Sequence, residues 1–273
     1  MDALLEPFQF TFMVRALIVS LAVGIVAPVM GAYVVSRGLA LMGDALSHAV
    51  LPGIVVAVLF GLTPALGTIP VAIIMALLIG YLSRRTGFSE DTTIGILFVG
   101  LFALGLAMLS ISTSLPVRLD DILLGQVLGV SWADVFVTLG LGLLALMLLY
   151  SFHKELVFVT FDPVGARVAG VRTGLFDNML LGVLALVIVV ALQAVGIILV
   201  LAMLIVPAAT ARLLVRRFAP AMIVGAVLGI IIAIAGLYIS FYVNLPSGPA
   251  MTLVAVVQFV LAVAFRGKAF RHR

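Results

Sequence analysis

Asp44 and His48 lie in the middle of an apolar stretch of this chain, Leu41 to Gly53. If the stretch is helical, two residues four positions apart project from the same face and can reach one ion. A charged residue at the centre of a membrane helix costs about 2.5–3.5 kcal/mol on insertion scales. Carboxylate and imidazole donors suit Mn²⁺, Fe²⁺ and Zn²⁺. The pair therefore indicates a metal or proton site inside a membrane.

The competing interpretation is a structural hydrogen bond within the pair, which we call the private hydrogen bond. His48 would donate to Asp44 and only fix helix packing. Ionisable residues in lipid-embedded helices mark ion or proton paths by default, which favours a functional site. Two donors are too few for tight binding. A second copy of the chain would add another aspartate and histidine and complete a four-ligand set. Pro52 and Gly53 follow the pair and would let the helix bend or end there.

The composition is that of a membrane protein. Of the 273 residues 65% are hydrophobic and 10% charged, with a mean hydropathy of +1.40, whereas soluble domains have roughly 25% charged residues. We predict one all-α transmembrane domain over residues 1–273 with eight or nine spans. The apolar runs are 12–35, 41–62, 66–83, 92–112, 132–152, 177–194, 195–215, 219–241 and 249–265. The run from Met179 to Val215 is too long for one helix, and a break is expected between Gln193 and Gly196.

The basic residues predict the orientation of the spans, because Lys and Arg concentrate on the cytoplasmic side. The cytoplasmic clusters are Arg84-Arg85, Lys154/Arg167/Arg172, Arg212/Arg216/Arg217 and Arg266/Lys268/Arg271/Arg273, with Arg37 on the same side. Two spans separate successive clusters, so the N-terminus lies outside and the C-terminus in the cytoplasm. Arg15 and Arg118 do not fit this scheme. The segment Leu115 to Val130 is too polar to span, and we expect it to be external or interfacial.

The longest cytoplasmic loop, His153 to Gly174, contains the start signal of a short helix. Asp162 is an N-cap residue, and Pro163 suits the first helical position. A helix over 162–170 buries little by itself, so we expect it to dock on a partner.

Three other motifs have structural interpretations. Glu90-Asp91 is read as a solvated helix start, and the glycine pairs Gly125/Gly129 and Gly225/Gly229 as close helix contacts. Pro207, in a run of small residues, indicates a hinge or a close-packed seam.

Several chemistries have no residues to support them in the sequence. It contains no Walker A motif and no cysteine, so we expect no ATP binding of that kind and no thiolate ligation. The net charge of +4 is attributed to membrane orientation and not to nucleic acid.

The chain resembles the membrane permease subunits of ATP-binding-cassette importers for zinc, manganese and iron. The most specific motif is Gly43-Asp-Ala-Leu-Ser-His-Ala-Val-Leu-Pro-Gly53. Weaker motifs follow in the expected order: Leu5-Glu-Pro-Phe8, Phe12-x-x-Arg15-Ala16, Ser36-Arg-Gly38, Glu90-Asp-Thr-Thr-Ile-Gly95, Leu124-Gly-Gln-Val-Leu-Gly129, Asp162-Pro-x-x-Ala166, Val195-Gly-Ile-Ile-Leu199, Pro207-Ala-Ala-Thr-Ala211 and Leu245-Pro-Ser-Gly248. Together they cover essentially the whole chain.

The resemblance implies more than the residues do. Such permeases work in pairs in the prokaryotic inner membrane, bound to cytoplasmic ATPase subunits, and receive metal from an extracytoplasmic binding protein. The metal path is carried over to Asp44 and His48. The helix that docks on the ATPase is carried over to the segment with Asp162, Pro163, Ala166 and Gly170.

The resulting hypothesis is a permease, not an enzyme, that moves a divalent transition metal into the cytoplasm by alternating access. We expect it to work as a dimer, with a second copy of the same chain as the first expectation and a related permease as the alternative. The metal is its substrate, and no permanently bound cofactor is expected. Pro52, Gly53 and Pro207 are candidate hinges. An ion-coupled secondary transporter that uses Asp44 and His48 as a proton relay is the alternative. A membrane enzyme ranks last because no nucleophile or second catalytic cluster accompanies the pair.

Overall fold

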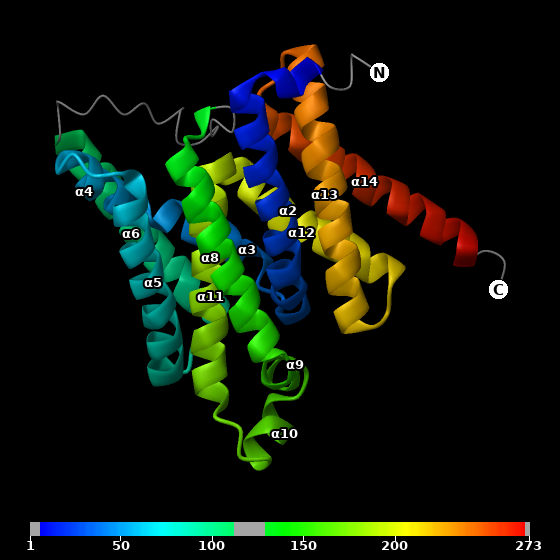
Figure 1. Cartoon of the computed structure of the whole chain (residues 1–273). Coiled ribbons are helices and arrows are strands. Elements are labelled where there is room, and N and C mark those ends of the chain that lie inside the picture. The colour runs from blue at the N-terminus through cyan, green and yellow to red at the C-terminus, as the bar shows by residue number, and fades with distance from the viewer. Residues whose placement is uncertain (1–5, 112–128, 271–273) are drawn as a thin grey trace. The chain divides into compact units, whose positions relative to one another are not determined.

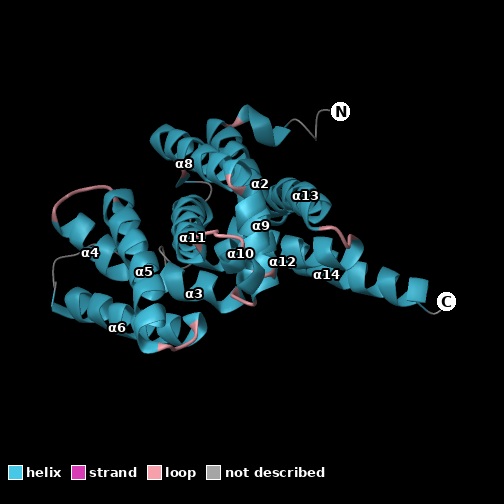
Figure 2. Ribbon diagram, turned by 90° about the horizontal axis from the view of Figure 1, so that it is seen from below, coloured by secondary structure: helices cyan, strands magenta, loops and turns pink. Residues whose placement is uncertain are grey.

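The structure is a computed structural model that describes residues 6–111 and 129–270. Every regular element in these ranges is a helix (Figures 1 and 2). The elements are η1 (Glu6–Gln9), α2 (Thr11–Arg37), α3 (Ala40–Ala49), α4 (Leu51–Leu59), α5 (Pro64–Thr86), α6 (Glu90–Ile111), α8 (Trp132–Ser151), α9 (His153–Phe161), α10 (Pro163–Val168), α11 (Thr173–Val195), α12 (Ile197–Leu214), α13 (Phe218–Val243) and α14 (Ser247–Phe270). The external element predicted between Leu115 and Val130 lies almost wholly outside the described residues.

Eight segments of the described chain are long and apolar enough to cross a membrane, and Leu199–Leu214 is a shorter apolar helix. The prediction of an all-α bundle with eight or nine spans is therefore confirmed. The predicted break between Gln193 and Gly196 is also confirmed: α11 ends at Val195, and α12 begins at Ile197. Gly196 between them has φ 80° and ψ 168°, a conformation reserved almost entirely for glycine. Orientation and dimerisation stay predictions.

The described residues form two compact units, of which the first contains residues 6–35, 129–143 and 190–270. Here α12, α13 and α14 pack against one another. Gly24 of α2 and Gly229 of α13 bring the two backbones together, because a Cβ on Gly24 would lie 2.8 Å from the Gly229 carbonyl oxygen. The prediction that the Gly225/Gly229 motif is a packing contact is confirmed at Gly229.

The second unit contains residues 36–111 and 144–189 and holds the predicted metal pair. Helices α4, α5 and α6 pack side by side (Figure 1), and α3 packs against α6 and α5. One candidate span, Met42–Leu59, includes most of α3 and all of α4. It is interrupted at Val50, two residues before Pro52, whose missing N–H cannot continue a helix. Asp44 and His48 therefore lie on a short helix that ends within the span.

Candidate metal site

Asp44 and His48 face each other on α3. The His48 Nδ1 atom lies 3.0 Å from the Asp44 backbone oxygen and 3.3 Å from Asp44 Oδ1. A neutral imidazole donates from one ring nitrogen and keeps the other as a lone-pair donor. With Nδ1 directed at Asp44, Nε2 is the nitrogen that can ligate a metal. Histidine ligands in metalloproteins almost always engage their second nitrogen in this way.

The Asp44 carboxylate opens onto a cavity of about 260 Å³ between α3 and α6. Its side chain is 45% exposed, whereas that of His48 is 22% exposed. The lining residues are Asp44, Ala45, Asp91, Ile94, Gly95 and Phe98. The contact with His48 is the one that the private hydrogen bond would require, but the cavity also makes the carboxylate accessible to an ion.

The α6 side of the site was missed by the sequence analysis. Asp91, interpreted there as a solvated helix start, is indeed exposed in the first turn of α6, yet it lines the same cavity as Asp44. Phe98 and Phe102 place their rings 6.0 Å and 5.7 Å from the His48 ring, both edge to face. Helical spacing places residues 91, 95, 98 and 102 on one face of α6. The sequence therefore contained a pattern that could have predicted this side of the site.

The donors that the structure describes in one chain do not form a complete metal site. Among the described residues, no three His, Asp or Glu side chains come close enough to hold one ion. Asp91 adds negative charge to the cavity but does not bring the set to three. That each copy supplies two donors stays a prediction.

The candidate hinges lie in different surroundings. Pro52 and Gly53 are buried in the first turn of α4, where the Gly53 backbone touches Gly67 of α5. Pro207 lies inside α12, which continues to Leu214. The neighbouring Ala208 is buried against Gly31 of α2, so this region is a close-packed seam. Hinge motion stays a prediction.

The segment predicted to dock on a partner has the expected local structure. The Asp162 carboxylate caps α10 by accepting the Gly165 N–H at 2.8 Å, and Pro163 occupies the first turn. Ala166 is fully buried, whereas Val168 is 86% exposed. After α10 the chain turns at Gly170, which has φ 83°. Val164 of the same helix is 60% exposed. Docking of this segment on a partner stays a prediction.

Comparison with known proteins decides the family. Residues 9–266 match the model of the ABC 3 transport family. The chain belongs to this family. It is therefore a multi-pass permease subunit of an ATP-binding-cassette transporter, and ATP hydrolysis belongs to a separate subunit.

Similar proteins cover nearly the whole chain. The manganese transport system membrane protein MntC of Halalkalibacterium halodurans is 44% identical over 263 residues, covering 96% of this chain and 90% of that protein. The chelated iron transport system membrane protein YfeD of Yersinia pestis is 38% identical over 260 residues, covering 95% and 87%. Among solved structures, PsaBC from Streptococcus pneumoniae superposes with a TM-score of 0.83 at 35% identity, covering 95% and 94%.

Proposed function

We propose that this permease moves a divalent transition metal into the cytoplasm through a path that includes Asp44 and His48. The observation that carries the proposal is a carboxylate–imidazole pair beside a cavity within an apolar span. Relatives named for manganese and iron transport support the same class of substrate. Mn²⁺ is the first candidate because MntC, which is 44% identical to this chain, is named for manganese transport. The carboxylate and imidazole donors suit Fe²⁺ and Zn²⁺ as well.

The two side chains have different roles in this proposal. Asp44 supplies negative charge to a cation that has lost part of its water. His48 supplies a nitrogen donor, which disfavours Ca²⁺ and Mg²⁺ because these ions prefer oxygen ligands. Two donors bind weakly, and weak binding suits an ion that must leave again. A second copy of the chain contributes two more donors, and the ion is held between the copies in one state of the transport cycle.

ATP drives the cycle from the cytoplasm. With the N-terminus outside and the C-terminus inside, α10 faces the cytoplasm and docks on the ATPase subunit. A binding protein outside delivers the metal. Docking of α10 is supported by its capped helix and by the exposure of Val164 and Val168. Its place on the cytoplasmic side is supported by the distribution of Lys and Arg.

Uptake of radioactive Mn²⁺ by cells that carry the permease, its ATPase and its binding protein tests the metal path. Asp44→Ala should abolish accumulation, while the variant stays in the membrane and co-purifies with the ATPase. Asp134→Asn is the matched control, because Asp134 pairs with Ser131 at the start of α8 and should transport normally. Undiminished uptake by Asp44→Ala removes the proposed role. Metal transport in proteoliposomes without any ATPase would contradict ATP-driven transport.

A further inference from the structure

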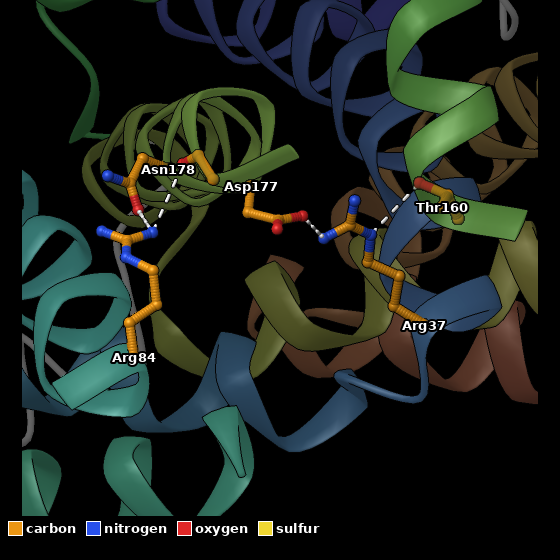
Figure 3. Close-up of polar contacts among 6 residues, drawn as sticks. Arg37, Arg84, Thr160, Asp177 and Asn178 are labelled. Atoms are coloured by element: carbon orange, nitrogen blue, oxygen red, sulfur yellow. Dashed lines mark hydrogen bonds and ion pairs between the residues drawn. The ribbon is translucent and has the colours of Figure 1, made fainter. Parts of the chain in front are cut away.

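Arg37 links the helices that flank α10 to the helix that carries the metal pair. It ends α2, and its Nη1 donates to Asp177 Oδ1 of α11 at 2.8 Å (Figure 3). Its Nε donates to Thr160 Oγ1 of α9 at 3.1 Å. Thr160 lies in the last turn of α9, two residues before Asp162, and Asp177 lies in the first turns of α11, the helix that follows α10. One guanidinium therefore joins both sides of the α10 segment.

A second arginine makes a parallel contact from α5. Arg84 Nη1 donates to Asn178 Oδ1 at 2.9 Å and to the Gly174 carbonyl at 3.3 Å (Figure 3). Gly80 of α5 lies directly against the Asn178 amide, where a Cβ would clash with its oxygen. The start of α11 is thus held to α5 next to the point where Asp177 holds it to Arg37.

The Arg37–Asp177 ion pair is partly removed from water. The two side chains are 11% and 29% exposed, and Arg37 Nη2 is buried without a hydrogen-bond partner among the described residues. Attraction between charges strengthens as water is excluded, and removing one member leaves the other uncompensated. Glu90, in the first turn of α6, interacts electrostatically with both Arg37 and Arg84. The charges of α5, α6 and α11 therefore meet around the end of α2.

Only Gly38 and Leu39 separate Arg37 from α3, which carries Asp44 and His48. We propose that Arg37 is a positioning residue that transmits displacement of the α10 segment to the metal pair through its bonds to Asp177 and Thr160. This inference rests on the proposed function. When the ATPase moves α10, α9 and α11 move with it, and the ion pair carries the movement to the start of α3. Arg84 and Asn178 hold α11 to α5 during the same step.

The test uses the complete transporter, permease and ATPase together, in proteoliposomes supplied with the binding protein and Mn²⁺. Metal uptake and ATP hydrolysis are measured in the same vesicles, and their ratio is the readout. Breaking this partly buried ion pair should lower uptake per ATP by about tenfold in Arg37→Gln, with ATP hydrolysis kept within about twofold of wild type. The exchanged pair Arg37→Asp with Asp177→Arg should recover part of the ratio.

Two matched controls separate transmission from general loss of charge. Lys154→Gln removes an exposed charge from α9 and should leave the ratio unchanged. Arg84→Gln should lower the ratio, whereas Arg85→Gln should not, because Arg85 donates to Tyr81 of its own helix.

The outcomes divide cleanly. A lowered ratio in Arg37→Gln with recovery in the exchanged pair supports the inference. An unchanged ratio overturns it, as does a parallel loss of uptake and hydrolysis without recovery, because that result marks a purely structural role. If the wild-type complex hydrolyses ATP but moves no divalent metal, the proposed function fails and this inference fails with it.

Discussion

Replacing Gly24 by alanine should destabilise the contact between α2 and α13. A Cβ at this position would lie 2.8 Å from the Gly229 carbonyl oxygen and 3.0 Å from the Gly229 carbonyl carbon. Ordinary contacts begin at 3.4 Å, so the helices must separate by about 0.6 Å, the difference between 3.4 and 2.8 Å. Both obstructing atoms belong to the backbone of α13 and cannot rotate aside. The strain must therefore spread along the two helices.

The size of the effect follows from the cost of overpacking a tight interior, which is about 1–3 kcal/mol. For a chain of this length, each kcal/mol lowers the melting temperature by about 2–4 °C. Gly24→Ala should therefore melt about 2–12 °C below wild type. The measurement is thermal unfolding of the purified permease in lipid nanodiscs, followed by intrinsic fluorescence.

Gly182→Ala is the control for this prediction. Gly182 lies within α11, and a Cβ there would meet no atom within 4 Å. Alanine is favoured over glycine in a helix by about 0.5–1 kcal/mol, so this variant should melt at or above the wild-type temperature. If Gly24→Ala melts as high as wild type, the backbone contact between α2 and α13 is refuted.

Three further predictions concern the two functional segments. Asp162→Ala removes a helix cap worth about 1 kcal/mol and should speed amide hydrogen exchange at Gly165 about fivefold. Asp162→Asn keeps the oxygen acceptor and should leave the exchange rate unchanged. Equal exchange rates in the two variants would contradict the capping hydrogen bond. Asp91→Asn should lower Mn²⁺ uptake by about two- to fivefold, as expected for a solvated charge near the ion. This loss of uptake should be smaller than the loss in Asp44→Asn. An equal or greater loss in Asp91→Asn would make Asp91 the principal carboxylate. His48→Asp should increase inhibition of uptake by Ca²⁺ and Mg²⁺, since an oxygen donor replaces a nitrogen donor, and unchanged competition would exclude His48 from selectivity.

Features set by the local backbone could be predicted from the sequence. The N-cap at Asp162, the proline that follows it, and the helix break at Gly196 all depend on a few neighbouring residues. Such positions obey rules of capping and backbone conformation that do not require the rest of the fold. The number and type of spans followed equally directly from the length of the apolar runs.

Contacts between distant segments could not be predicted in the same way. Arg37 and Asp177 are 140 positions apart, and each alone resembles an ordinary charge at the end of a membrane helix. Asp91 also fits the pattern of an acidic residue in the first turn of a helix. Because that local interpretation was sufficient, the sequence analysis did not place Asp91 beside Asp44. A local rule that is sufficient by itself gives no reason to look for a second role. Only the packing of α3 against α6 shows which charged residues share a cavity.

The backbone at Gly196 has a consequence for reading genetic screens of this transporter. Its φ of 80° and ψ of 168° would strain any residue with a Cβ by about 1–3 kcal/mol, although no ligand is lost. Random mutagenesis scored by growth under metal starvation should therefore recover substitutions at Gly196 together with those at Asp44. Abundant external metal should restore growth to variants with a weakened ligand set but not to those with a misdirected α12. Growth measured at several external metal concentrations would thus distinguish metal-binding defects from folding defects without a further structure.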